Sequence, residues 1–247
     1  CKQHRLVVPQ GVHNVGERQS TQFSFRHGLF QIYLYGELNQ VEKIHLHGLI
    51  GSELENRYRK HLQQYPQMAH TLARHFELAH LPQKAINYFE IAGDIAKRFT
   101  AHQEAIQHYA HALALLKGLP QSTQRNQKEL ELQLRLGPPL TAIKGWGAPE
   151  LEKAYDRAQI LCEGIDDNRK LFSALFLLAT FRLGRSEHAE AERLVNRLFK
   201  IARQINDQKY LAIAYLQVSP FYQGNFTQAR WLFERASAVR DLNLQRH

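Results

Sequence analysis

A helical spacing of small and aromatic residues recurs along this chain and constrains its fold more than any other feature. The pattern Ala-x3-aromatic-x2-Ala occurs at residues 85–92, 105–112 and 229–236, and residues 151–158 carry a variant of it. Steps of four and three residues place all three positions on one face of a helix. Small residues let a neighbouring helix approach closely, and the aromatic ring fills the remaining gap. The pattern predicts closely packed successive helices.

Glycines add a second regularity to the helical pattern. Gly184 precedes Ala189 by five residues, Gly224 precedes Ala229 by five, and the two pairs lie 40 residues apart. Helical hairpins with this face and a glycine turn are typical of tetratricopeptide-like repeats. We therefore expect a mainly α fold, a tetratricopeptide-like solenoid of helical hairpins with irregular repeats. A plain helical bundle with alanines and aromatics in its core is the alternative.

The start of the chain differs from the rest. Residues 6–8 and 22–25 are short β-type runs separated by glycine, asparagine and serine, which predicts a β-hairpin. Apolar periodicity then predicts helices over residues 26–35, 39–58, 68–79, 85–99, 101–116, 149–162, 168–183, 187–205, 208–222 and 226–241. Thr100 and Gln103 have the spacing of a capping box for the helix that begins near residue 101.

Residues 128–136 are ambiguous, because four leucines alternate strictly with polar residues, as in a strand. The segment contains no β-branched residue and consists of good helix formers. A solenoid helix is packed on two sides, so we predict a helix here. Gly137-Pro138-Pro139 and residues 145–147 are expected to bracket a break before Pro149 opens the next helix.

Composition is that of a globular chain, with 247 residues, 44% hydrophobic and 22% charged. The net charge of +9 admits acidic partners, but the basic residues are spread along the chain, which favours a solvated surface over a nucleic-acid groove. Cys1 and Cys162 form no disulfide framework or zinc motif. No apolar run has the length of a membrane span. We expect a cytoplasmic protein without a membrane partner.

Sequence motifs of catalysis are missing. The chain contains no phosphate-binding Gly-x4-Gly-Lys-Ser/Thr loop and no Gly-x-Ser-x-Gly elbow. His75 and His80 are five residues apart, so they point to different helix faces and do not form a metalloprotease zinc motif. We therefore expect no enzyme activity, no metal and no cofactor in this chain. A pocket with convergent titratable groups would be needed to support an enzyme.

Several segments together resemble bacterial signalling ATPases of the STAND type. Phe23-Ser-Phe-Arg-His-Gly-Leu-Phe-Gln-Ile-Tyr33 is similar to their segment F-x-F-R/K-H-A-L-x-Q/R-x-x-Y. Three further segments, residues 72–86, 129–137 and 144–158, resemble later parts of the same proteins in the same order. The resemblance spans roughly residues 5 to 240.

The resemblance implies a division of the chain at about residue 65. Residues 1–65 would be the end of a winged-helix subdomain and a connecting helix, and residues 66–247 the start of a tetratricopeptide-like sensor superhelix that continues further. The full-length protein would bind ATP or ADP, and its sensor would act on an effector domain of the same chain. Without the ATPase, an apolar face near residues 1–50 would be exposed, so we expect some self-association.

His27 is the residue that the resemblance connects with a nucleotide. In related switch ATPases a His of the winged helix contacts the β-phosphate of ADP, within a Met-His-Asp-like motif. Here the tripeptide is Arg26-His27-Gly28, so the Asp is missing. A His near a helix N-terminus still suits a phosphate group. The alternative is that His27 only locks the subdomain.

Polar residues on the first helix of each hairpin are the candidates for partner binding, because a solenoid presents an extended surface there. We select Arg74, Asn87, Lys97, Arg169 and Arg182 as exposed candidates for a protein or small ligand. A DNA-binding transcriptional regulator is the alternative function. Nucleic acid is the less favoured partner, because residues 26–35 would be the recognition helix and contain one basic residue.

Overall fold

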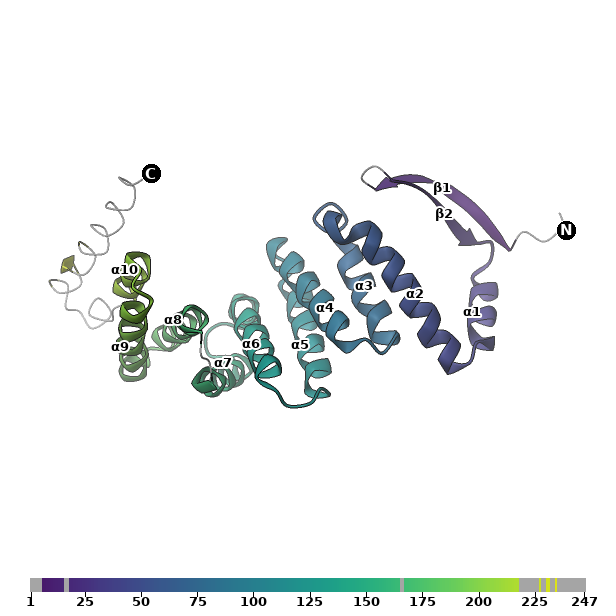
Figure 1. The fold of residues 1–247 in the computed structure, drawn as a ribbon. Helices are drawn as coiled ribbons and strands as arrows, with labels where there is room; N and C mark the ends of the chain where they lie inside the picture. Colours follow the sequence, from purple (N-terminus) through teal and green to yellow (C-terminus); the bar gives the residue numbers. More distant parts are fainter. Residues whose placement is uncertain are drawn as a thin grey trace. The chain divides into compact units, whose positions relative to one another are not determined.

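The structure is a computed structural model that describes residues 6–15, 18–164 and 167–217, together with Thr227, Arg230, Trp231 and Glu234. The described part is mainly α, as the sequence predicts, with ten α-helices and one two-stranded sheet (Figure 1). The chain forms two compact units, Cys1–Gly118 and Leu119–His247. The division predicted at residue 65 lies inside the first unit, where helix α2 packs against α3.

The first unit begins with the predicted β-hairpin, which is longer than the sequence indicates. Strand β1 (Val7–Val15) pairs antiparallel with β2 (Arg18–Phe25), and the register is irregular between Pro9 and Gly11. Helices α1 (Gly28–Glu37) and α2 (Gln40–Tyr58) follow. A capping box begins α2, because Asn39 accepts from the backbone of Glu42 and the Glu42 side chain accepts from the backbone of Asn39.

Three antiparallel helices complete the first unit. The short 3-10 helix η1 (Arg59–His61) leads to α3 (Gln67–Leu78), α4 (Pro82–Arg98) and α5 (His102–Lys117). Loops of three residues join these helices, so each reverses direction relative to the one before. The pattern residues of α4 and α5 are buried, which confirms the predicted faces: Ala85, Phe89, Ala92, Ala105, Tyr109 and Ala112.

The predicted capping box at Thr100 and Gln103 is wrong. Thr100 adopts a left-handed conformation with a φ of 58°, and its hydroxyl donates to the carbonyl of Phe99. Ala101, without a capping side chain, precedes the first residue of α5. A three-residue reversal needs a left-handed residue, and Thr100 takes that role in place of a cap. His80 does the same between α3 and α4.

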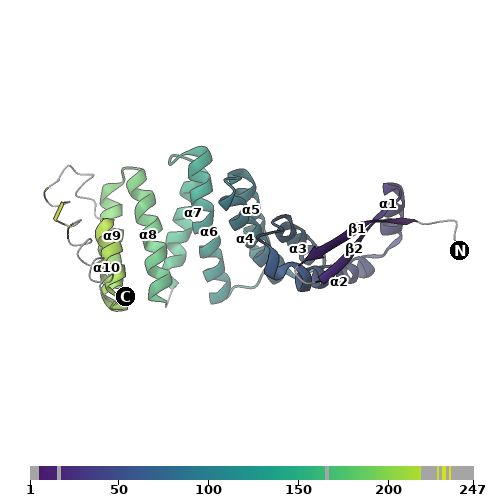
Figure 2. The same ribbon diagram turned by 90° about the horizontal axis from the view of Figure 1, so that it is seen from above.

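The second unit consists of five described helices and a 3-10 turn (Figure 2). Their bounds are α6 (Thr123–Lys144), α7 (Pro149–Leu161), η2 (Cys162–Gly164), α8 (Asn168–Gly184), α9 (His188–Ile205) and α10 (Gln208–Leu216). The last predicted helix and the third copy of the repeat pattern, residues 229–236, lie outside the described residues.

Helix α6 confirms the helical prediction for residues 128–136 and corrects the predicted break after it. The helix continues through Pro138 and Pro139 to Lys144. Two prolines remove two backbone hydrogen bonds, but tertiary packing outweighs this cost. Pro139 and Leu140 are buried, and the Thr141 hydroxyl donates to the carbonyl of Gly137. The break occurs only at residues 145–147.

Glycines beneath aromatic rings set the distance between neighbouring helices. A Cβ added to Gly93 of α4 would lie 2.5 to 2.8 Å from the ring of Tyr109 on α5. Gly51 faces Phe76 in the same way, and Gly184 faces Trp146. Gly184 therefore serves a packing role within α8, whereas the turn that follows uses Ser186 in a left-handed conformation.

Candidate interaction surface

Helices α3 and α5 present matched polar stripes to each other in the first unit. His70, Arg74 and Glu77 follow one another on α3 at steps of four and three residues, and Glu104, His108 and His111 do the same on α5. Residues at these steps share one helix face. We call the surface formed by these six residues the α3–α5 groove.

Direct contacts join the two stripes. One carboxylate oxygen of Glu77 accepts from Arg74 at 3.2 Å, and the other lies 2.8 Å from Nε2 of His111. The rings of His70 and His108 have centroids 5.2 Å apart. Phe89 of α4 lies below, with its ring centroid 4.4 Å from that of His111. Because Phe89 is fully buried, the groove has a rigid apolar floor.

A cavity of about 490 Å³ adjoins this groove. Its polar lining includes Thr71, Glu104 and both His70 and His108. Its apolar lining comes from the end of α4 and the loop after it, namely Ala92, Ile95, Ala96, Phe99 and Ala101. The volume and the mixed lining are typical of small-molecule and peptide sites.

Two groove histidines are held in the neutral form at pH 7. Burial lowers the pKa of His70, and the positive charge of Arg74 lowers it further. Burial also lowers the pKa of His108, with a further contribution from His70. A neutral imidazole donates one hydrogen bond and accepts another. These two rings therefore suit uncharged polar groups such as those of a peptide backbone.

The predicted partner-binding residues of the first unit occupy different surfaces. Arg74 is exposed within the groove and pairs with Glu77. Asn87 is exposed on α4, the second helix of its hairpin. Lys97 is half-buried on α4 and lies 3.7 Å from Asp94. The structure thus places only Arg74 in the groove.

In the second unit, Arg169 lines a cavity of about 260 Å³ formed by α6, α8 and α10. Lys170, Ser173 and Tyr210 line the same cavity. Glu131 also lines it, and its carboxylate lies 3.8 Å from the Lys170 ammonium group. Arg169 is thus exposed at a cavity, and its role in partner binding stays a prediction.

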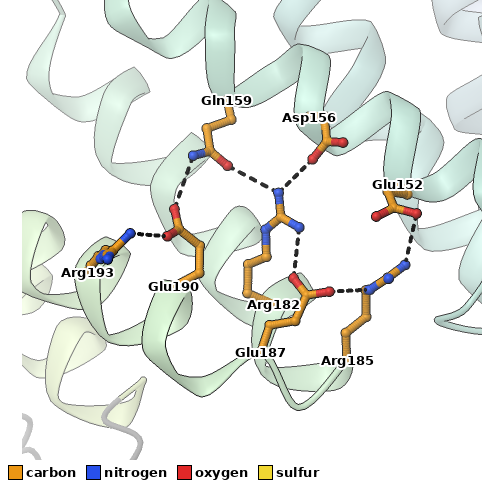
Figure 3. A network of polar contacts seen from close by, with 8 residues as sticks. All are labelled: Glu152, Asp156, Gln159, Arg182, Arg185, Glu187, Glu190 and Arg193. Atoms are coloured by element: carbon orange, nitrogen blue, oxygen red, sulfur yellow. Dashed lines mark hydrogen bonds and ion pairs between the residues drawn. The ribbon is translucent and has the colours of Figure 1, made fainter.

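Arg182 is not the exposed residue that the sequence indicates, because its side chain is only 12% exposed. Its guanidinium donates to Asp156 at 2.6 Å and to Glu187 at 2.8 Å (Figure 3). The prediction of exposure failed because the end of α8 is enclosed by acidic residues of α7 and the α8–α9 loop. Arg182 therefore connects three parts of the second unit.

The network around Arg182 extends along α7 and α9. Glu187 also accepts from Arg185 at 2.6 Å, and Arg185 lies 3.4 Å from Glu152. Gln159 joins Arg182 to Glu190, as Figure 3 shows. Burial raises the pKa of Glu187, but the hydrogen bonds from both arginines outweigh it and lower the pKa overall.

His27 precedes the first residue of α1, as predicted, and its side chain is exposed. Its ring makes no capping hydrogen bond to the helix and lies 5.9 Å from the ring of Phe30. The imidazole is therefore accessible to a ligand at the start of α1.

Sequence reasoning missed the groove histidines, because polar residues at helical spacing are also typical of an ordinary solvated helix face. The signal that identifies them is the equal spacing of polar residues on α3 and α5. Among the described residues, no cluster of three or more His, Cys, Asp or Glu side chains is arranged to hold a metal ion. None of the helices in the described part has the length and apolar character that crossing a membrane requires.

Comparison with known proteins identifies a fold but no family. No protein-family model matches the chain, and no curated protein matches it. Among solved structures, BtubC (BKLC) from P. vanneervenii matches with a TM-score of 0.59 and 13% sequence identity, over 85% of this chain and 94% of that one. At this identity the match concerns the fold alone, and it agrees with the mainly α, solenoid-like architecture.

Proposed function

We propose that this chain is the sensor and interaction segment of a multidomain signal-transduction ATPase of the STAND type. Its helical-repeat surface binds a protein or a small ligand, and the hairpin with α1 transmits binding to a nucleotide switch elsewhere in the same protein. The chain itself performs no catalysis. The family assignment rests on the sequence resemblance, and the geometry supports the sensor role.

The observation that carries the proposal is the exposure of α1. This helix has no buried residue, although much of it is apolar. Leu29, Ile32 and Tyr33 are 78%, 71% and 65% exposed. Phe23 on the neighbouring strand is 60% exposed. A two-stranded hairpin and an apolar helix are not stable without a covering surface. We propose that the ATPase part of the protein covers them.

The α3–α5 groove supports the ligand-binding part of the proposal. It offers a cavity, a fixed apolar floor and neutral hydrogen-bonding groups in one place. The DNA-binding alternative is not favoured, because α1 contains no lysine or arginine to contact a DNA backbone.

The experiment compares the natural full-length protein with this 247-residue chain by hydrogen exchange of the α1 amides and by ADP binding. We expect the full-length protein to bind ADP and to protect α1, and we expect this chain to leave α1 unprotected. Equal exchange in both proteins and no bound nucleotide would contradict the proposal and leave a free-standing helical-repeat adaptor.

A single substitution tests the nucleotide role of His27 in the full-length protein. We expect His27→Ala to change the rate of ADP release or the basal activity, because the imidazole would contact the β-phosphate. His45→Ala is a matched control within the first unit, because His45 is also exposed and lies on α2. Unchanged ADP release and activity in the His27 variant would show that this residue serves the structure only.

A further inference from the structure

A pocket lined by positive side chains lies between the α2–α3 connection and the second half of α4, within the first unit. Its volume is about 410 Å³. We call it the basic pocket, and its lining consists of Arg59, Lys60, His61, Leu62, Gln63, Gln64, Ile91, Ile95 and Arg98. The basic residues come from two segments that α3 and most of α4 separate in sequence, so the fold brings them together.

Most of the positive charge of the basic pocket has no acidic partner in the described part of the protein. No carboxylate lines the pocket, and neither Lys60 nor Arg98 forms an ion pair there. The charge of Arg59 helps to lower the pKa of Glu55, but no ion pair joins these two residues. The acid closest in sequence to the η1 residues, Glu55, lies 2.6 Å from the Lys84 ammonium group and 2.9 Å from the Tyr88 hydroxyl. Arg182 and Arg185 of the second unit, in contrast, lie in ion pairs with acidic residues, as Figure 3 shows.

The chemistry of the lining selects a phosphoryl group. Arginine presents a planar fork of donors that matches a phosphate, and lysine adds a compact positive charge. Gln63 and Gln64 supply neutral amide donors. Leu62 and Ile95 are buried at 8% and 5% exposure and offer apolar contacts beside these groups. A ligand that combines a phosphate with a small organic group satisfies both parts.

We propose that the basic pocket binds a small phosphate monoester. Its phosphoryl group contacts Arg59, Lys60 and Arg98, and its organic part lies against Leu62 and Ile95. The pocket has the volume of a small-molecule site. A DNA-binding module buries roughly 600–1,000 Å² of protein surface, so a DNA site would extend well beyond the residues that line this pocket. The inference does not depend on the family resemblance.

Calorimetric titration of this chain with phenyl phosphate and with inorganic phosphate tests the proposal. We expect phenyl phosphate to bind more tightly, because only its ring contacts the apolar lining. The double variant Lys60→Gln/Arg98→Gln should weaken phenyl phosphate binding by about tenfold or more, because it removes two charge-assisted contacts. Both side chains belong to exposed residues, and an unchanged circular dichroism melt would verify the fold of the variant.

The matched control removes two exposed positive charges elsewhere. Lys117→Gln/Arg203→Gln lowers the net charge by the same amount, both residues are exposed, and neither lines the basic pocket. We expect this control to bind phenyl phosphate within about twofold of the unmodified chain, because distant exposed charges are screened by salt. Equal binding by the Lys60/Arg98 variant, or an equal loss in the control, would overturn the proposal in favour of general attraction to a chain of net charge +9.

Discussion

At the residue scale, Gly93 determines how closely α4 and α5 pack. Tyr109 is fully buried, and its hydroxyl donates to Asp94 at 2.7 Å, so its ring has no room to move. We expect Gly93→Ala to destabilise the first unit by about 1–3 kcal/mol, as overpacking usually does. Native-state hydrogen exchange of the α4 and α5 amides measures this loss. Gly48→Ala is the control, because its Cβ would meet only Ala79 at 3.8 Å.

Arg182 provides a second test at this scale. Its removal leaves Asp156 and Glu187 without their shared cation, so we expect Arg182→Ala to cost roughly 1–3 kcal/mol of stability. Thermal unfolding followed by tryptophan fluorescence reports on the second unit, because both tryptophans belong to it. Arg193→Ala should change little, since Arg193 is 81% exposed. Equal melting of the two variants would show that the network does not stabilise the unit.

At the element scale, histidine pairs make the packing of α2 on α3 sensitive to acid. Nδ1 of His47 lies 2.9 Å from Nδ1 of His75, so one ring must accept a hydrogen bond in its neutral form. Burial lowers the pKa of both rings. The positive charge of Arg74 lowers the pKa of His47 further, and His47 in turn lowers the pKa of His75. The hydroxyl of Tyr35 on α1 lies 2.9 Å from His47.

These pKa directions fix the sign of the pH effect. The unfolded chain has histidine pKa values of about 6.5 and takes up protons first as the pH falls. The two neutral rings are therefore compatible with the folded state above about pH 6.5. Below that pH the unfolded state gains stability by taking up protons, so the free energy of unfolding falls. We expect the urea midpoint to fall between about pH 7.5 and about pH 5, and His75→Gln to reduce the fall. A midpoint independent of pH would contradict this role of the pair.

The same elements show what sequence reasoning could and could not predict. Helix faces followed from the spacing of Ala85, Phe89 and Ala92, because periodicity reports burial directly. The continuation of α6 through Pro138 could not be predicted in this way, because its stability comes from contacts with α7 that the local sequence does not encode. The α3–α5 groove was missed for a similar reason, since its two stripes become one surface only when the helices pack.

At the scale of the whole molecule, the described surface is uneven in character. Arg182 and Arg185 of the second unit lie in internal ion pairs, whereas the first unit carries an exposed apolar face on β2 and α1 and a basic pocket that no carboxylate lines. Both features of the first unit are accessible to a partner. We expect the apolar face to cause self-association even in the isolated chain, because exposed apolar surfaces associate in water.

Self-association through α1 is the expected consequence. We expect the weight-average mass in sedimentation velocity to rise with protein concentration, and Leu29→Lys/Ile32→Lys to abolish the rise. Both side chains are more than 70% exposed, so the substitutions should not unfold the unit. Ile160→Lys is the control, because Ile160 is 61% exposed on α7 and lies outside this face. A mass that stays constant in the unmodified chain, or falls equally in the control, would exclude α1 as the contact surface. The loss of association in the α1 variant alone would identify the face that the rest of a larger protein is proposed to cover.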